Sequence, residues 1–474
     1  MSVQFDFVVI GGGSAGYAGA SAAARLGLRT AVVEGAREVG GLCILRGCMP
    51  SKTLLESAHR AEAVRRAGEF GLRAEYFGAN AAAIRARKRR LIGEFADYRR
   101  GQLEHGQFEL IRGQSEFVDA HTVDVRLLDG GLRRVESRAF LVATGSEIAV
   151  PPLPGLAEAG YRTSDDVLDA DEFPDSVCVL GGGAIALELA SFFHGIGVPT
   201  TIIQRSAHVL REMDTDVADE LTRALERRGI AVHRDTTIAA IVRDGAIKRV
   251  EYTDAAGDSH AVEAHEIVCA LGRRPATHGL GLDRAGVTLD AARIPISETQ
   301  QSSAPHIFAA GDVCGPHEVV HLAIEQGVLA ARNAARLLGK LGGELDRMDY
   351  ALKLFAVFTD PQAAMVGLTE REALELGIDF VAAKYAFADC GKAMVRGEID
   401  GFVKLIAERE SRRIIGGACV GPEASELIHE IVVAMRFGAT AAQLASTPHY
   451  HPTLSEIWTY PADELAAGAP EAAG

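Results

Sequence analysis

The chain has 474 residues, a length that predicts two to four domains rather than a single core. A formal net charge of −15 excludes a general affinity for nucleic acid or for anionic membrane surfaces. Seven cysteines, scattered except for one pair, exclude a disulfide scaffold and show no metal-ligand spacing, so no metal is expected.

No apolar run is long enough to cross a bilayer, and no signal peptide is expected before the first strand. Together with the sparse cysteines, these features favour a reducing, cytoplasmic location.

The chain opens with a pattern that is typical of a dinucleotide-binding unit. Residues 5–10 form an expected buried strand, followed by the turn Gly11-x-Gly13-x-x-Gly16, an Ala-rich helix and a second strand that ends at Glu34. The glycines let the backbone approach a pyrophosphate at the helix N-terminus, and Glu34 can accept a hydrogen bond from a ribose hydroxyl. We interpret this unit as the FAD site.

A glycine-rich segment, residues 40–52, carries Cys43 and Cys48 five positions apart. Its three glycines let the segment bend, so this spacing can close a small disulfide ring. Cys48 stands at the start of an expected helix, whose dipole favours a thiolate there, and Lys52 lies one turn further on the same face. The segment predicts a redox-active pair; the alternative is two buried cysteines in a glycine-rich turn.

The same unit recurs about 170 residues later. The turn is Gly181-x-Gly183-x-x-Ala186, between expected strands at residues 176–180 and 200–203. Two such units in one chain predict two dinucleotides. The apolar runs at 138–145, 266–272 and 306–312 are expected to return to the two sheets, the last of them ending in Asp312.

The second unit differs from the first where the acid should stand. Gln204 occupies the position of Glu34, Arg205 follows it, and Arg211 is nearby. Loss of the acid and gain of arginine suit a 2′-phosphate, so we expect NADP(H) to be favoured over NAD(H). Two ordinary surface arginines are the alternative.

The remainder of the chain lacks a nucleotide turn and predicts an α+β domain with a helix at 423–437. It contains His451 and, five residues on, Glu456, which could form a base and its orienting acid, although a surface histidine is the simpler reading. The predicted class is α/β with two Rossmann-like domains. The expected boundaries are 1–150 and 277–345 for a split FAD domain, 151–276 for NAD(P), 346–461 for an interface domain, and 462–474 for a disordered tail.

Together, these features resemble the flavin-dependent pyridine nucleotide–disulfide oxidoreductases, the family of dihydrolipoamide dehydrogenase, glutathione reductase and mercuric reductase. The resemblance covers nearly the whole chain and is carried by its glycine turns, by the segment from Cys43 to Lys52, and by the motifs at 144–145, 308–313, 359–361, 366–368 and 451–456.

The resemblance implies a role for each site residue. Cys48 would lie beside the flavin and Cys43 would exchange with substrate. Lys52 would pair with Glu188 near the flavin, and His451 with Glu456 would serve the active site of the other subunit of a homodimer. The residues expected to bind tightly held, non-covalent FAD or the nicotinamide dinucleotide are Gly11, Gly13, Ser14, Gly16, Glu34, Gly41, Thr144, Gly145, Asp312, Gly181, Gly183, Ala186, Gln204, Arg205, Arg211 and Gly272.

Three readings of the activity remain open at this point. The first is a dihydrolipoamide dehydrogenase-like enzyme acting on a small or lipoyl disulfide. The second is an NADPH-dependent reductase of another low-molecular-weight disulfide, or a mercuric reductase-like enzyme. The third is a subunit that docks a lipoyl-carrying partner. Leu42 and Leu45 replace the family's usual Thr and Asn, and no cysteine follows Cys419, which disfavours mercury reduction.

Overall fold

The computed structural model describes residues 3–468, which form two compact units. The first consists of the described residues up to Ser51, with Arg85–Ala149 and Gly272–Asp349. The second consists of Lys52–Ile84, Val150–Leu271 and the described residues from Tyr350. The finer division into FAD, NAD(P) and interface domains stays a prediction.

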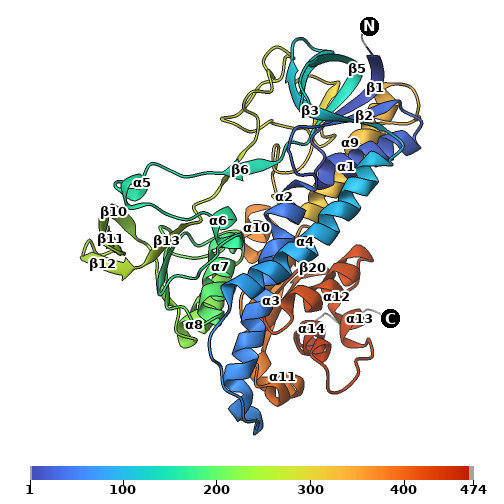
Figure 1. Ribbon diagram of the computed structural model, residues 1–474. Coiled ribbons are helices and arrows are strands. Elements are labelled where there is room, and N and C mark those ends of the chain that lie inside the picture. Colours follow the sequence, from blue (N-terminus) through green and yellow to red (C-terminus); the bar gives the residue numbers. More distant parts are fainter. Residues whose placement is uncertain (1–2, 469–474) are drawn as a thin grey trace, which may run out of the picture. The chain divides into compact units, whose positions relative to one another are not determined.

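The first unit is built on a sheet with a parallel centre, in which β1 pairs with β2 and β5, β2 with β3, and β15 with β5 (Figure 1). The strands β3, β4 and β5 continue as an antiparallel meander. Phe7, Val8 and Val9 of β1 are fully buried, as expected for a strand covered on both faces. The strands are β1 (Val3–Ile10), β2 (Thr30–Glu34), β3 (Glu109–Phe117), β4 (Thr122–Leu127), β5 (Leu132–Val142) and β15 (Ile307–Ala309), with β6 (Ser146–Ile148) and β14 (Arg273–Pro275) as a separate pair.

Two helices of this unit, α1 (Ser14–Arg25) and α9 (Val320–Leu337), lie side by side (Figure 1). They approach so closely that a Cβ atom on Gly327 would lie 2.3 Å from the Ala15 carbonyl oxygen. Glycine and alanine are therefore required at this contact, which fixes the start of α1 below the first glycine turn. The unit also contains α2 (Gly41–Leu45), the start of α3 (Cys48–Arg65) and most of α4 (Ala81–Glu104).

The second unit contains a parallel sheet in the order β13-β7-β8-β9 and a small antiparallel sheet, β10-β11-β12. Helices α7 and α8 pack against the parallel sheet, with Phe192, Leu221 and Ile202 in the shared core. The elements are β7 (Val177–Leu180), α7 (Ala184–Gly195), β8 (Thr200–Ile203), α8 (Thr215–Arg227), β9 (Ala231–His233), β10 (Thr237–Asp244), β11 (Ile247–Thr253), β12 (Ser259–Ala264), β13 (Glu266–Cys269), and the short helices α5 (Leu156–Ala159), α6 (Ser164–Leu168) and η1 (Arg66–Phe70).

The C-terminal part of this unit is a five-stranded antiparallel sheet in the order β16-β17-β20-β19-β18. Helices α12 and α14 pack on it around the fully buried Trp458. The elements are β16 (Leu354–Val357), β17 (Gln362–Gly367), α10 (Glu370–Glu375), β18 (Phe380–Ala386), η2 (Phe387–Asp389), α11 (Gly391–Arg396), β19 (Phe402–Glu408), β20 (Ile414–Gly421), α12 (Ala424–Arg436), α13 (Ala441–Ala445), η3 (Ser455–Trp458) and α14 (Thr459–Ala467).

The prediction of a disordered tail from residue 462 is wrong for its first part. Helix α14 continues to Ala467 and buries Ala462 and Leu465 against the interface core. The remaining residues of the predicted tail, 469–474, lie outside the described part of the chain. No helix within residues 3–468 combines the length and the apolar character that crossing a membrane requires.

Candidate active site

The first glycine turn has the backbone that its sequence predicts. Gly11 has φ +102°, and a Cβ atom there would lie 2.4 Å from the carbonyl oxygen of Ala143. A Cβ atom on Gly16 would lie only 1.8 Å from the Gly11 carbonyl oxygen. Gly13 caps α1, and Ser14 is the first helical residue. The turn can therefore be made only by glycines, and it places the N–H groups of the α1 terminus at the end of β1.

Two carboxylates flank this turn. Buried Glu34 accepts the Gly12 N–H through Oε2 and the Ala36 N–H through Oε1, both at 2.8 Å. A carboxylate has further acceptor positions, so these bonds fix its orientation and leave room for a ribose hydroxyl. Asp312, after β15, accepts from Ser146 Oγ at 2.6 Å through Oδ2.

The cysteine segment packs directly on this turn. Gly41, with φ +72°, starts α2, and a Cβ atom on it would lie 2.7 Å from the Gly13 Cα. A Cβ atom on Gly47 would lie 3.3 Å from the Cys43 Cα, so the segment folds back on itself between the two cysteines. Cys48 is the first residue of α3, where the helix dipole favours a thiolate.

The other cysteines provide a contrast. Cys43 and Cys48 are half-buried, whereas the remaining five are buried. Burial raises the pKa of Cys178 to about 12, and burial likewise raises that of Cys314 to about 12 against the opposing charge of Arg293. Buried neutral thiols are poor nucleophiles, so the half-buried pair is the better suited to thiol chemistry.

Lys52 and Glu188 form the ion pair that the resemblance implied, although they are 136 positions apart. Lys52 Nζ lies 2.8 Å from both carboxylate oxygens. Glu188 is buried on α7 and also accepts the Phe358 N–H at 3.1 Å, while Lys52 Nζ lies 4.6 Å from the centre of the Phe358 ring. The pair is held from several sides and has little freedom to move.

The second glycine turn repeats the first with one difference. Gly181 has φ +125°, and its Cβ atom would lie 2.4 Å from the Ala270 carbonyl oxygen. Gly183 caps α7, and Ala186 is fully buried where the first turn has Gly16. This turn therefore accommodates the methyl group for which the first turn has no room.

Gln204 and two arginines stand beside this second turn. The Gln204 side chain packs against Gly182 and donates to the His208 carbonyl oxygen at 3.3 Å. The following loop returns to the turn, since the Leu210 N–H donates to the Gly182 carbonyl oxygen at 2.9 Å. Arg205 and Arg211 are exposed, and neither side chain forms an ion pair within residues 3–468. Both are available to a phosphate.

His451 and Glu456 are paired as predicted from their spacing. His451 Nδ1 lies 2.9 Å from Glu456 Oε2; the carboxylate is 10 % exposed and the imidazole 77 % exposed. The buried acid thus orients a ring whose other nitrogen faces outward. An outward-facing, oriented imidazole is suited to a site completed by another subunit.

Comparison with known proteins decides the family. The pyridine nucleotide-disulphide oxidoreductase profile matches residues 5–327, and the dimerisation domain of the same family matches residues 355–462. The chain belongs to the pyridine nucleotide-disulphide oxidoreductases.

Individual relatives agree with this family. The chain is 34 % identical over 461 residues to the dihydrolipoyl dehydrogenase of Chlamydia trachomatis, covering 97 % of this chain and 96 % of the relative. It is 32 % identical over 482 residues to that of Geobacillus stearothermophilus, covering 99 % and 97 %. It is also 32 % identical over 456 residues to the mercuric reductase of Bacillus cereus, covering 96 % and 70 %. The chain is thus a flavin-dependent disulfide oxidoreductase similar to dihydrolipoyl dehydrogenase.

Pyridine nucleotide-disulphide oxidoreductases bind FAD and a pyridine nucleotide, and the residues of this chain fit both groups. A Cβ atom on Gly145 or on Gly272 would meet nothing within 4 Å, so the space beside each of these two glycines is open. Thr144 Oγ1 donates to the Ala276 carbonyl oxygen at 2.7 Å and so fixes the strand end beside the first turn. Within residues 3–468, Asp312 Oδ1 accepts no hydrogen bond and is available to a cofactor hydroxyl.

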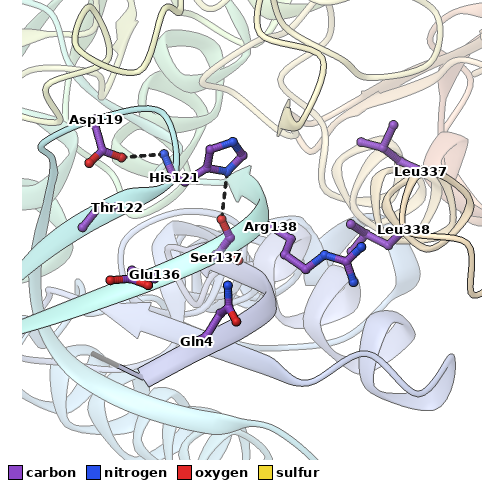
Figure 2. Close-up of a pocket in the computed structure, with 9 residues that line it drawn as sticks. All are labelled: Gln4, Asp119, His121, Thr122, Glu136, Ser137, Arg138, Leu337 and Leu338. Carbon is purple, nitrogen blue, oxygen red and sulfur yellow. Dashed lines mark hydrogen bonds between the residues drawn. The ribbon is translucent and has the colours of Figure 1, made fainter. Parts of the chain in front are cut away.

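A hollow of about 590 Å³ lies elsewhere in the first unit (Figure 2). Gln4, at the start of β1, lines it, whereas the glycine turn follows the end of β1. His121 and Asp119 also line it, held by hydrogen bonds to Ser137 and to the His121 backbone. The hollow therefore lies near the start of β1, at the opposite end of this strand from the glycine turn. None of the predicted site residues lines it.

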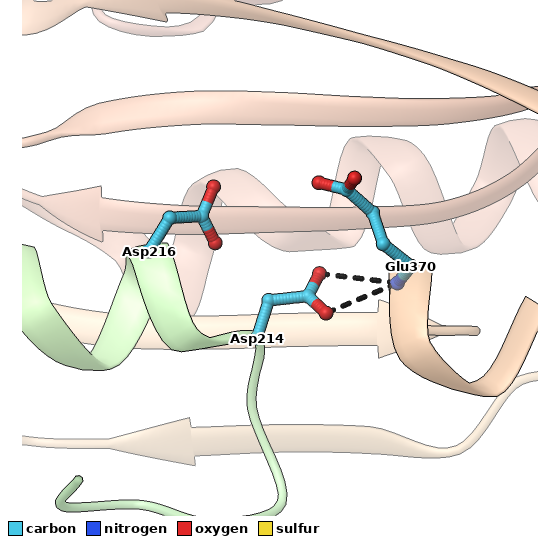
Figure 3. Close-up of side chains that lie close together, drawn as sticks. All are labelled: Asp214, Asp216 and Glu370. Carbon is cyan, nitrogen blue, oxygen red and sulfur yellow. Dashed lines mark hydrogen bonds between the residues drawn. The ribbon is translucent and has the colours of Figure 1, made fainter. Parts of the chain in front are cut away.

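Three carboxylates of the second unit, Asp214, Asp216 and Glu370, point toward one another (Figure 3). The fully buried Lys404 donates to all three, at 2.6, 2.9 and 2.9 Å. Lys384 also pairs with Asp216, so two ammonium groups balance the cluster, which joins the start of α8 to strand β19 of the five-stranded sheet.

Several contacts of the oxidoreductase site carried no signal in the sequence. Phe358 beside Lys52, Ser146 beside Asp312, and the half-buried Arg99 on α4 are distant in sequence from the groups that they contact. No local pattern could have found them, because each depends on long-range packing.

Proposed function

We propose that the chain is a dihydrolipoyl dehydrogenase-type enzyme that moves electrons between NADP(H) and a small or lipoyl disulfide through Cys43 and Cys48. The observation that carries the proposal is the contact of Gly41 with Gly13, which holds the cysteine segment against the first dinucleotide turn. A thiol pair fixed beside a flavin turn suits the exchange of electrons between a flavin and a disulfide.

The net reaction balances as one hydride and one proton added to one disulfide, which becomes two thiols. Bound FAD supplies a carrier that accepts the hydride of the nicotinamide and passes on an electron pair. In the chain itself, Cys48 would lie nearer the flavin, and the Cys43–Cys48 disulfide of the oxidised enzyme would accept the electron pair and break. Cys43 as thiolate then attacks the substrate disulfide, and its own mixed disulfide is resolved by Cys48.

The charged pairs have separate tasks in this scheme. Glu188 holds the Lys52 ammonium group in place on α3, four residues beyond Cys48. His451, oriented by Glu456, takes the proton of an attacking thiol or returns it to a leaving thiolate. We infer that it acts in the site of a second copy, because its imidazole is exposed on a domain matched to dimerisation.

The preference for NADP(H) is supported by the exposed Arg205 and Arg211, and by an amide, Gln204, in place of an acid. An acid at this position would repel a 2′-phosphate, whereas unpaired guanidinium groups can bind it in a bidentate manner. Cytoplasmic location is supported by the scarcity of cysteine outside the redox pair.

A reductase of another low-molecular-weight disulfide is the second candidate. Leu42 and Leu45 give the cysteine segment apolar side chains next to Cys43, which would suit a different small substrate. The chain is also similar to a mercuric reductase, but no cysteine follows Cys419, so mercury is the less favoured substrate.

The test is the steady-state reduction of oxidised lipoamide with NADH or NADPH at equal concentration. Turnover with lipoamide supports the proposal, and a higher rate with NADPH supports the nicotinamide assignment. If the nicotinamide reduced the flavin but lipoamide were not turned over, the second candidate, a reductase of another low-molecular-weight disulfide, would be favoured instead. Cys43→Ala should abolish disulfide reduction while Cys419→Ala, at a buried cysteine of β20, preserves it; an active Cys43→Ala enzyme would overturn the mechanism.

A further inference from the structure

Arg99, on α4, is a charged group whose surroundings the scheme above does not explain. Its guanidinium lies 4.2 Å from the centre of the Tyr17 ring, and its Nη1 atom is buried without a hydrogen-bond partner. It forms no ion pair within residues 3–468. Its neighbour Arg100, in contrast, is exposed and lies 2.6 Å from Asp97. A half-buried guanidinium without a carboxylate is costly and calls for a functional reason.

The contacts of the first unit place Arg99 beside the cysteine segment. The Tyr17 N–H donates to the Gly13 carbonyl oxygen at 2.9 Å, so the ring that Arg99 covers stands one turn above the glycine turn. Gly41 packs on Gly13, and Cys43 is two residues further on in α2. Arg99 and Cys43 are thus both held at the start of α1.

Electrostatics supports the same placement. Burial lowers the pKa of Arg99, while the negative forms of Tyr17, Cys43 and Tyr98 act in the opposite direction. Among the charges of this region, Arg46 on α2 lies 3.2 Å from Glu38, so its charge is already balanced.

We propose that Arg99 is a positioning residue that holds the counter-charge for the Cys43 thiolate in the reduced enzyme. The inference rests on the proposed function, in which Cys43 is the exchanging thiol. When the Cys43–Cys48 bond accepts two electrons and one proton, one sulfur remains a thiolate. The helix dipole favours that charge at Cys48, and the Arg99 guanidinium stabilises the second thiolate, at Cys43, once His451 has taken its proton for the attack on substrate.

The groups that face Cys43 can be separated by substitution. Cys48 begins α3, Arg46 is on the same short helix as Cys43, Tyr17 comes from α1, and Arg99 from α4. Of these, only Arg99 lacks a carboxylate partner while carrying a fixed charge. Arg99→Gln removes that charge, Arg99→Lys keeps it, and Arg100→Gln removes a charge of the same type one residue away.

The experiment measures alkylation of Cys43 in the holoenzyme. The enzyme is reduced with dithiothreitol, desalted without oxygen, and labelled with iodoacetamide between about pH 5 and about pH 9, where thiolates form. Mass spectrometry then follows the peptides that contain Cys43 and Cys48 separately. Thermal unfolding of each variant checks that it is folded.

Arg99→Gln is expected to raise the midpoint of Cys43 alkylation by about one pH unit, since a nearby opposite charge lowers a pKa by about that amount or more. Arg99→Lys keeps the charge, so its midpoint should stay close to that of the wild type. Arg100→Gln should leave the midpoint of Cys43 alkylation unchanged. An unchanged midpoint in folded Arg99→Gln overturns the inference, whether or not FAD is retained. The proposed function is tested by a separate measurement. It would fail if the Cys43→Ala variant still reduced disulfides.

Discussion

Replacing Arg205 with alanine should change the choice between the two nicotinamide dinucleotides without harming the fold. Arg205 follows β8, is exposed, and forms no ion pair within residues 3–468, so its loss leaves no buried charge behind. The second turn depends on Gly181, Gly183 and Ala186, and the Arg205 side chain is hydrogen-bonded to none of them. The variant therefore tests recognition of the 2′-phosphate alone.

The size of the effect follows from the exposure of the side chain. A hydrogen bond to a charged group contributes about 1.5–3 kcal/mol, and a solvent-exposed arginine belongs at the lower end of this range. About 1.4 kcal/mol corresponds to a tenfold change. We expect Arg205→Ala to lower kcat/KM for NADPH about tenfold and to leave kcat/KM for NADH within about a factor of two.

The assay is steady-state turnover with a saturating disulfide, with each dinucleotide varied in turn. Arg249→Ala, at an exposed arginine of β11, is the matched control and should change neither value. Gln204→Glu should act in the opposite sense, because a carboxylate repels the phosphate and accepts from a ribose diol. An equal loss for NADH and NADPH, or no loss for either, would refute the assignment of Arg205.

Two further predictions concern buried charges. Lys404→Met removes the buried ammonium group shared by three mutually close carboxylates and leaves Lys384 as the remaining lysine partner of Asp216. It should destabilise the protein by about 3 kcal/mol or more in urea unfolding, whereas exposed Lys340→Met should have no effect. Burial alone would raise the pKa of Asp216, but hydrogen bonds from its lysine partners outweigh this and hold the pKa below its ordinary value. The stability that this carboxylate contributes is fully present above its ordinary pKa of about 3.9 and is lost as the pH falls through its lower pKa in the folded protein. The difference in free energy of unfolding between Lys404→Met and the wild type should therefore become smaller in acid. A difference that stays constant with pH would contradict this account. Glu456→Gln should lower turnover about tenfold or more, because His451 loses the charged partner that orients it, and a rate equal to wild type would exclude that role.

The two glycine turns were predictable because each depends on neighbouring residues. A strand followed by Gly11, Gly13 and Gly16 leaves few alternatives for the backbone, and the acid at Glu34 falls at the end of the next strand for the same reason. The pairing of His451 with Glu456 was equally local, since the two are five positions apart.

The contacts between distant segments could not be predicted from local patterns. The partnership of Lys52 with Glu188 entered through the resemblance to a family, and the position of Arg99 over Tyr17 entered only with the structure. The end of α14 was misjudged because Ala, Glu and Gly are common both in helices and in unstructured tails. Only the burial of Leu465 decides between them.

The two dinucleotide units cannot be exchanged as interchangeable parts. The first unit has no room for a methyl group at Gly16, because a Cβ atom there would overlap the Gly11 carbonyl oxygen. In the second unit, the methyl group of Ala186 occupies the corresponding position. Grafting the second turn into the first unit would force helix and strand apart, whereas the reverse graft would leave only a methyl-sized gap. A chimaeric protein should therefore tolerate the swap in one direction and fail in the other.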